Sequence, residues 1–515
     1  MALLKAAATV GGYTLLSRVL GFARDVLTAA LLGAGPVADA FFVAQRLPNL
    51  FRSLFAEGAF SAAFVPLFAG RIAQDGEENA KRFAEDALSV LLAALIIFTI
   101  LGEIFTPEIL SVIAPGFASD PEKFGLTVDL TRITFPYLLY ISLATLLGGM
   151  LNSVERFAAT AATPTLLNIA LIIALVTTRP PSGYALAWAT SAAGLAQFLW
   201  LMVSCHRAGI APRLPWPRLT PEVRRLVRVM APGVVGAGAT QLNLLVSTAV
   251  ASLLPAGAVS YLYYADRLNQ LPLAVVGIAV GTAILPSLSR QVRQGDTEAA
   301  IETQNRGLEL ALLLTLPAAV ALGITAHAIL FALFQRGAFG PEEVAATAPA
   351  LAAYAAGLPA FVLVKVMTPG FFARQDTGTP VKIAVVSMAS NILLTLALML
   401  PLAHVGNALA NSAAGWINAL ALIVILHRRG HFRLDARCQR ALPRIVLASL
   451  GMGAVLLFLE GVLIPGEQAG LLLRALGLAA LVASGIVTFA GLALLFGATD
   501  VRGLKQLLKR RRPAP

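Results

Sequence analysis

Long apolar runs constrain this chain more than any other feature of its sequence. About fourteen segments of roughly 20 or more mainly apolar residues follow one another, separated by short polar joints. A helix of that length crosses the hydrocarbon core of a bilayer, which is about 30 Å thick. Hydrophobic residues make up 58% of the chain and charged residues only 13%, whereas about a quarter of a soluble domain is charged. The sequence therefore predicts an all-α polytopic membrane protein.

The basic residues indicate on which side of the membrane each joint lies. The predicted spans cover residues 4–33, 37–68, 85–112, 126–151, 160–178, 184–205, 229–254, 258–289, 307–333, 345–372, 380–401, 404–427, 441–464 and 469–497. With a cytoplasmic N-terminus, about 28 of the 39 Lys and Arg residues fall on cytoplasmic joints. Only Lys123, Arg179 and Arg336 fall on outside joints. This asymmetry predicts cytoplasmic N- and C-termini, and it explains the net charge of +12 without a nucleic-acid partner.

An internal repeat predicts the domain organisation. Residues 40–83 and 260–302 each carry an aromatic run, then Arg-Leu, a small-residue stretch, a proline and a polar joint. A second pair of similar joints ends at Pro164 and Pro380. Each half holds six spans, and an even number predicts parallel rather than inverted lobes. The predicted domains are an N-terminal six-helix lobe (1–205), an amphipathic cytoplasmic linker (206–228), a C-terminal six-helix lobe (229–430), two additional spans (431–497) and a basic cytoplasmic tail (498–515).

Several ionisable residues fall within or at the ends of predicted spans. A lipid-facing charge there costs roughly 2.5 to 3.5 kcal/mol on insertion scales, so such residues normally face the bundle interior or a water-filled cavity. We expect most of them to line one cavity between the lobes. As an alternative, Arg46 pairs with Asp39 and Arg267 with Asp266. The whole set is Arg18, Arg24, Asp25, Asp39, Arg46, Arg52, Glu57, Arg132, Asp266, Arg267 and Lys365.

The balance of these charges predicts a bound anion. Near Arg18, Arg24 and Arg52, the basic residues outnumber the acidic ones, because Asp25 and Glu57 cannot satisfy all three. The planar guanidinium bonds two oxygens at once, which suits a phosphate or a pyrophosphate better than a lysine ammonium does.

The sequence carries no pattern typical of an enzyme. It holds no GxxxxGK phosphate loop and no HExxH motif, and its predicted outside joints are short. His427 and His431 lie four residues apart, and we interpret them as interfacial residues rather than metal ligands. We therefore expect a transporter without catalytic residues, resident cofactor or metal. Its driving force would be an ion gradient, the membrane potential or the gradient of the substrate.

Four segments carry a family resemblance. They are SRVLGFARD (17–25), ADAFFVAQRLPNLFRSLFAEGAFSAAFVP (38–66), YYADRLNQLP (263–272) and FFARQDTGTPVK (371–382). In these segments, and over nearly the whole length, the sequence resembles the MurJ (MviN) lipid II flippases. That family belongs to the multidrug/oligosaccharidyl-lipid/polysaccharide (MOP) exporter superfamily.

The resemblance implies two lobes around a V-shaped central cavity, an alternating-access cycle and a groove for the lipid tail at the last two spans. It implies that four arginines bind the pyrophosphate of lipid II, and that acidic and basic neighbours form a gating network. The family's coupling to sodium or membrane potential cannot be placed, because the seventh span offers only neutral candidates: Gln241, Asn243 and Ser247. The implied pyrophosphate ligands are Arg18, Arg24, Arg52 and Arg267, and the implied network is Asp25, Asp39, Arg46, Glu57 and Asp266.

The expected function is translocation of lipid II from the inner to the outer leaflet of the bacterial cytoplasmic membrane. Expected partners are lipid II, membrane lipids and the cell-wall synthesis machinery. Two alternatives are a drug/cation antiporter of the same superfamily and a flippase for another undecaprenyl-linked oligosaccharide. The arginine surplus argues against the antiporter, whose cavity for organic cations would be acidic and aromatic. A membrane enzyme or an envelope scaffold is a further alternative, and it would tolerate loss of Arg24.

Overall fold

The computed structural model describes residues 2–53, 59–179 and 182–498. Within these ranges the regular secondary structure is helical, apart from an isolated bridge between Arg336 and Phe339, which confirms the all-α prediction. The helices in chain order are α1 (Ala2–Leu32), α2 (Pro36–Phe51), α3 (Ala59–Ile104), α4 (Thr106–Ile113), the 3-10 helix η2 (Pro115–Ser119), α5 (Pro121–Thr134), α6 (Pro136–Ser153), α7 (Phe157–Thr177), α8 (Gly183–Arg207), α9 (Pro221–Ser252), α10 (Ala258–Arg293), α11 (Thr297–Ile324), α12 (Ala326–Leu333), α13 (Pro341–Phe372), α14 (Gly378–Arg428), α15 (Ala436–Leu463) and α16 (Leu471–Leu495).

Several predicted spans differ from the helices in their boundaries. Among the described residues, nine helical segments are long and apolar enough to cross a membrane. Two of them are very long: α14 leaves helical geometry at Ala403, where two predicted spans meet, and α3 bends at Gly76, whose φ is 83°. Within the predicted span 37–68, the α-helix α2 ends at Phe51 and α3 begins at Ala59. Residues 54–58 lie outside the described ranges, so the continuity of this span stays a prediction. The number of fourteen spans stays a prediction.

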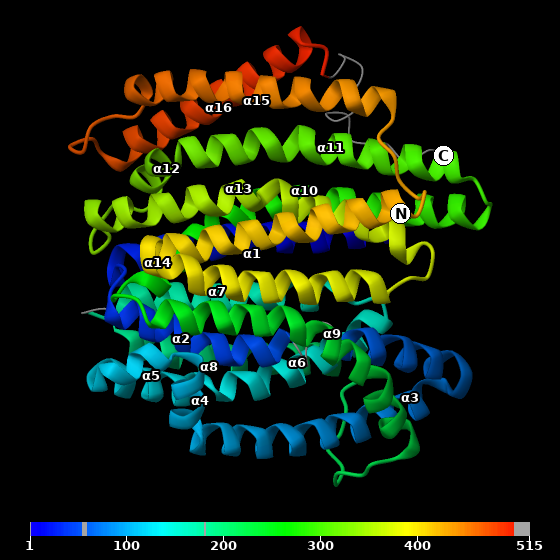
Figure 1. Ribbon diagram of the computed structural model, residues 1–515. Helices are drawn as coiled ribbons and strands as arrows, with labels where there is room; N and C mark the ends of the chain where they lie inside the picture. Colours follow the sequence, from blue (N-terminus) through cyan, green and yellow to red (C-terminus); the bar gives the residue numbers. More distant parts are fainter. Residues whose placement is uncertain (1, 54–58, 180–181, 499–515) are drawn as a thin grey trace. The chain divides into compact units, whose positions relative to one another are not determined.

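The chain folds into two compact units. The first comprises residues 1–260 and 336–339, and the second comprises residues 261–335 and 340–515. In the first unit, α1 packs on α7, α6 packs between α3 and α8, and α2 packs on α5 (Figure 1). In the second unit, α13 contacts both α11 and α14, and α15 packs between α11 and α16 (Figure 1).

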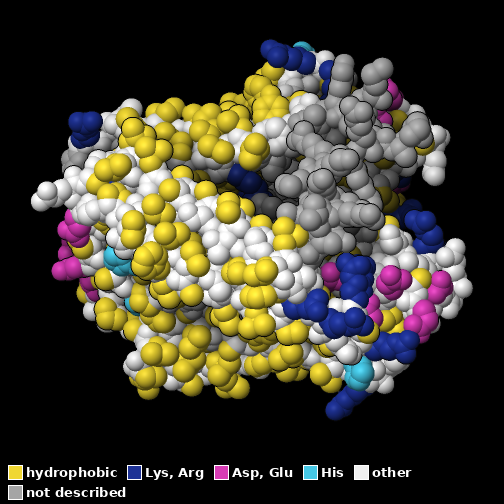
Figure 2. Space-filling view, turned by 90° about the horizontal axis from the view of Figure 1, so that it is seen from above, with side chains coloured by type: hydrophobic (Ala, Val, Ile, Leu, Met, Phe, Trp, Pro, Cys, Tyr) yellow, Lys and Arg dark blue, Asp and Glu magenta, His cyan; other side chains and the backbone are white. Residues whose placement is uncertain are grey.

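The helices expose apolar side chains that would be costly in water. Leu400 is 86% exposed, Phe458 is 74% exposed and Val112 is 75% exposed. Figure 2 shows hydrophobic side chains over a broad area of one face, with many of the charged side chains gathered toward its margins. Because exposed apolar patches of this extent are rare on soluble monomers, the surface is suited to contact with lipid tails.

Candidate functional site: buried charges on α1, α2 and α10

Arg24 and Asp25 form a buried ion pair on α1. The two residues are only 9% and 4% exposed, and Arg24 Nη2 lies 2.6 Å from Asp25 Oδ1. Arg24 Nη1 also donates to Asn168 Oδ1 on α7 at 3.0 Å, and Asn168 Nδ2 donates to the Ser17 carbonyl at 2.9 Å. The Asn168 amide therefore holds the guanidinium on one side and the α1 backbone on the other. Sequence analysis missed Asn168, although an asparagine within the apolar span 160–178 was the available signal.

Arg18 and Arg52 are less enclosed than Arg24. Arg18 lies on an exposed part of α1 and makes no hydrogen bond or ion pair within the described ranges. Arg52 follows the last residue of α2, is half-buried, and donates from Nε to Asn49 Oδ1 at 3.3 Å. Glu57, the predicted acidic neighbour, lies outside the described residues. The Arg18 guanidinium, which has no hydrogen-bond partner in the described part of the chain, is suited to bind phosphate oxygens.

Asp39 is the most completely bonded acidic residue of the set. It lies in the first turn of α2, is 1% exposed, and accepts from Lys123 Nζ at 2.9 Å. It also accepts from the Gly257 amide at 2.8 Å, and from the Ser260 amide and hydroxyl at 2.9 and 2.6 Å. Asp39 therefore pairs with Lys123, and the alternative in which it pairs with Arg46 is wrong. Arg46 itself is half-buried on α2.

The buried Lys123 ammonium group contacts an aromatic ring as well as Asp39. Its Nζ lies 3.9 Å from the centre of the Phe117 ring, a cation–π contact, and the residue is 7% exposed. The neighbouring Gly116 donates its amide to Ser252 Oγ at 3.0 Å, and a Cβ at Gly116 would lie 2.0 Å from the Ser252 carbonyl oxygen. The segment around Lys123 is therefore closely packed against the end of α9. Sequence analysis placed Lys123 on an outside joint but missed its role.

In the second unit, Arg267 and Asp266 each contact a residue one turn away on α10. Arg267 donates from Nε and Nη2 to the Tyr263 hydroxyl at 3.3 and 3.2 Å. Asp266 accepts from Gln270 Nε2 at 2.5 Å. Both charged residues are half-buried. The common cavity predicted for residues of the two units stays a prediction.

The remaining candidates lie in different surroundings. Lys365 is exposed, and Arg132 is exposed and donates to the Glu103 carbonyl at 3.2 Å. Gln241, a neutral candidate for the coupling ion, donates to Ser53 Oγ at 2.8 Å. Asp376 accepts from the Thr379 amide, in the first turn of α14, at 2.9 Å. Hydrogen bonds from Thr379 and then Arg429 hold the pKa of this partly exposed carboxyl well below its ordinary value.

An apolar groove lies along α11, α15 and α16 in the second unit. Its volume is about 530 Å³, and its walls include Leu313, Pro317, Met452, Leu456 and Phe489. In Figure 1, α15 and α16 lie side by side next to α11. These are the two C-terminal helices for which the sequence predicts a groove for a lipid tail.

The chain matches one protein family over most of its length. The profile of the family "Lipid II flippase MurJ" matches residues 28–474. The probable lipid II flippase MurJ of Rhizobium tropici is 44% identical, covering 100% of this chain and 98% of the relative. The corresponding protein of Rhizobium meliloti is 46% identical over 99% of this chain and 97% of the relative. Lipid II flippase MurJ of Burkholderia cenocepacia is 37% identical over 99% of this chain and 100% of the relative.

Solved structures agree with the sequence comparison. Lipid II flippase MurJ in an inward closed conformation superposes with a TM-score of 0.79 at 25% identity, covering 97% of this chain and 99% of that one. An inward-facing multidrug resistance MATE family transporter of the MOP superfamily superposes with a TM-score of 0.69 at 12% identity. That match covers 82% of this chain and 98% of the transporter, and it shows a common fold. The chain therefore belongs to the MurJ family of lipid II flippases, with the all-α fold of MOP-superfamily transporters.

Proposed function

We propose that this protein translocates lipid II from the inner to the outer leaflet of the bacterial cytoplasmic membrane. Full-length similarity to proteins named lipid II flippase supports this substrate. The observation that carries the proposal within the chain is Arg24, a buried arginine on α1 held in place by Asp25 and Asn168. A transporter of this family needs no catalytic residues, and both chain termini lie in the cytoplasm in our proposal.

In this proposal, Arg18, Arg24, Arg52 and Arg267 bind the pyrophosphate of lipid II. Arg24 is the anchor, because Asn168 and Asp25 fix its guanidinium before substrate arrives. Arg18, exposed on the same helix, supplies a guanidinium with no partner in the described part of the chain. Charge-assisted, bidentate hydrogen bonds of arginine to phosphate are among the strongest polar contacts in proteins. Asp25 keeps Arg24 in position, and Arg46, Glu57 and Asp266 belong to the same proposed network.

Asp39 acts as a gate residue in the proposed cycle. Its carboxylate bonds Lys123 on α5, the Gly257 amide before α10 and the amide and hydroxyl of Ser260. Releasing the first turn of α10 from α2 requires that the Gly257 and Ser260 bonds break together. A substrate that binds better once they are broken shifts the population toward the open state.

The lipid tail occupies the apolar groove along α11, α15 and α16. A polyisoprenoid is uniformly apolar, and the named walls of the groove are aliphatic, aromatic or thioether side chains. Transport is driven by a sodium gradient or by the membrane potential, with no ligand set assigned to the ion. Cell-wall synthesis proteins are the proposed partners.

The proposal is tested in cells depleted of the protein and supplied with wild type or with Arg24→Ala. An impermeant enzyme that cleaves lipid II is added outside the cells, and the cleaved fraction is measured. Wild type restores cleavage, whereas Arg24→Ala does not, because pyrophosphate binding has lost its anchor. The matched control is Arg290→Ala, which removes a solvent-exposed arginine near the end of α10. It is expected to restore lipid II cleavage to the wild-type level.

Immunoblots of membrane fractions establish that all three proteins are inserted at equal levels. If lipid II is exposed without the protein, lipid II is not its cargo, and the flippase for another undecaprenyl-linked sugar or the antiporter is the better hypothesis. If Arg24→Ala restores exposure fully, the assignment of the pyrophosphate to this arginine is wrong.

A further inference from the structure

Three arginines near the start of α15 line a second pocket of the second unit. The pocket has a volume of about 330 Å³ and lies between α15, α11 and the residues that follow α16. Arg437, Arg440 and Arg444 form one wall, and Glu309 and Gly497 belong to the others. None of these residues takes part in the proposed headgroup site.

The spacing of the arginines places them on one face of the helix. At 3.6 residues per turn, positions three and seven residues after Arg437 lie within about 60° of it around the helix axis. Arg437 donates to Glu309 Oε1 at 3.0 Å, and Arg444 donates to the Gly497 carbonyl at 2.9 Å. Arg440 is exposed and makes no hydrogen bond or ion pair within the described part of the chain. The pocket therefore presents an uncommitted guanidinium between two that are already oriented.

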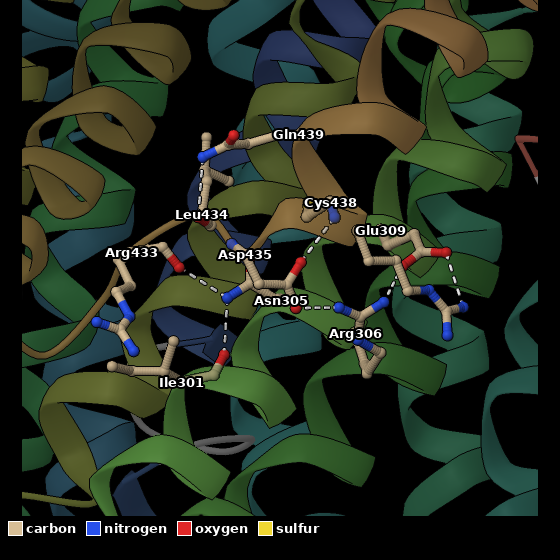
Figure 3. A network of polar contacts seen from close by, with 10 residues as sticks. Ile301, Asn305, Arg306, Glu309, Arg433, Leu434, Asp435, Cys438 and Gln439 are labelled. Carbon is tan, nitrogen blue, oxygen red and sulfur yellow. Dashed lines mark hydrogen bonds and ion pairs between the residues drawn. The ribbon is translucent and has the colours of Figure 1, made fainter.

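A polar network fixes the start of α15 on α11 (Figure 3). Arg306 pairs with both Glu309 and Asp435, and the Asp435 side chain accepts from the Cys438 amide at 2.6 Å, capping α15. Asn305 Nδ2 donates to the Arg433 carbonyl at 2.8 Å, and its Oδ1 accepts from the Asp435 amide at 3.3 Å (Figure 3). Because these bonds fix the first turn of the helix, the backbone that carries the three arginines is held in place before any ligand arrives. Such preorganisation reduces the entropy that binding costs.

The position along α15 indicates that the ligand is a lipid headgroup. Arg444 is followed by the apolar stretch that begins at Ile445, and the sequence predicts a membrane span from 441 to 464 with its start in the cytoplasm. The apolar groove is also lined by α11 and α15, with α16 as its third wall, and it begins on α15 at Met452, about 12 Å beyond Arg444 along the helix axis. The basic pocket thus lies where a charged headgroup sits while its chains extend into the bilayer core.

The charge of the pocket favours an anionic headgroup over a zwitterionic one. The three arginines and Glu309 sum to a formal charge of +2, and Glu309 is shared by Arg306 and Arg437. Because Arg437 is already paired with Glu309, Arg440 and Arg444 are the arginines that face the phosphate of the ligand. Basic pockets between membrane helices on the cytoplasmic side bind anionic lipid headgroups in this way. We propose that this arginine pocket binds the headgroup phosphate of an anionic phospholipid of the cytoplasmic leaflet.

Native mass spectrometry of the full-length protein, released from mixed detergent–lipid micelles, tests this proposal without requiring transport. The probes are phosphatidylglycerol, zwitterionic phosphatidylethanolamine and undecaprenyl pyrophosphate, each added separately. Wild type retains phosphatidylglycerol in preference to phosphatidylethanolamine. The double variant Arg440→Ala/Arg444→Ala lowers that preference about thirty-fold, because each arginine near an anionic lipid surface contributes about 1 kcal/mol and 1.4 kcal/mol corresponds to a factor of ten. Binding of undecaprenyl pyrophosphate stays unchanged.

The matched control is Arg290→Ala/Arg293→Ala, which removes two exposed arginines in the last turn of α10, outside the pocket. This control retains the preference, and an equal loss there would show that bulk charge alone attracts the lipid. An unaffected preference in the Arg440/Arg444 variant overturns the proposal. Loss of undecaprenyl pyrophosphate with phosphatidylglycerol retained assigns the pocket to the isoprenoid substrate instead. If the double variant does not fold, Arg440→Glu answers the same question, because it leaves the Arg444–Gly497 bond in place.

Discussion

Asp39 and Lys123 form an ion pair that is almost completely removed from solvent. Their side chains are 1% and 7% exposed, and Asp39 accepts three further hydrogen bonds from Gly257 and Ser260. Breaking a buried pair by removing one partner leaves an uncompensated charge, which costs more than the pair contributes. The contribution of this site to the free energy of unfolding therefore depends on the presence of both charges rather than on either residue alone.

Lys123→Met is expected to destabilise the protein by about 3–5 kcal/mol, because Asp39 would then be buried without a counter-charge. Adding Asp39→Asn to this variant should recover part of the loss, since the neutral amide needs no partner ion. The measurement is thermal unfolding of the three purified proteins and wild type as a double-mutant cycle. Additive effects of the two substitutions would contradict direct coupling between the residues.

The sequence pattern singled out the charged residues of α1 and α2, Asp25 included, but not the partners Asn168 and Lys123 on other helices. Arg24 and Asp39 stand out because charges within apolar spans are rare. Asn168 and Lys123 do not stand out, because one is neutral and the other belongs to a joint where a cation is ordinary. Which polar residue meets which charge depends on how α7 packs on α1 and how α5 packs on α2. These pairings are set by tertiary packing: Arg24 and Asn168, for example, are 144 residues apart in the sequence.

At the scale of helices, the apolar pattern located the spans but not their ends or breaks. The break of α14 at Ala403 follows Pro401 and coincides with a predicted joint between two spans. The end of α2 at Phe51 falls inside a predicted span, beside the polar residues Asn49, Arg52 and Ser53. Hydropathy averages over such a short polar stretch, so it reports where lipid can surround a helix but not the residue at which the helix ends.

A glycine in the segment that joins α12 and α13 is expected to be essential for local packing. Gly337 has a φ of 57°, and a Cβ there would lie 2.2 Å from the Ala30 carbonyl oxygen, beside the 2.8 Å bond from the Ala338 amide to that oxygen. Gly295 also has a positive φ, 73°, but its Cβ would meet nothing within 4 Å. Gly295→Ala therefore costs only backbone strain of roughly 1–2 kcal/mol, and Gly337→Ala costs more. The melting temperatures of the two variants measure this difference in stability. Equal decreases in melting temperature would show that the close approach of Gly337 to Ala30 does not affect stability.

The joint between α13 and α14 is expected to depend on pH only under acid conditions. Asp376 bonds Thr379 and Arg429, which hold its pKa well below the ordinary value of 3.8. Because the folded-state pKa is lowered, the stabilisation is fully present above pH 3.8 and is lost only as the pH falls toward the folded value. Asp376→Asn should therefore lower the melting temperature by the same amount at pH 7 and pH 5. If the difference in melting temperature between wild type and Asp376→Asn disappeared between pH 7 and pH 5, this assignment would be contradicted.

For the molecule as a whole, the fold and the chemistry come from different parts of the sequence. A MATE family transporter shares the fold with a TM-score of 0.69 at only 12% identity. Apolar spans of the right length and number are compatible with many sequences, so such a fold survives extensive substitution. The few charges within the spans are what distinguish this chain, and the sequence alone pointed to them. Their proposed assembly around one substrate depends on the relative position of the helices, which no periodicity specifies.

The predicted orientation of the chain in the membrane leads to a test of the number of spans. With a cytoplasmic N-terminus and fourteen spans, Gly295 follows the eighth span and faces the cytoplasm, whereas Gly466 follows the thirteenth and faces outside. In a chain whose buried Cys205 and Cys438 are replaced by serine, Gly466→Cys should react with an impermeant maleimide added to intact cells. Gly295→Cys should react only after the membrane is opened. Because one miscounted span between the two positions would place both on the same side, identical labelling of the two variants would show that the count is wrong.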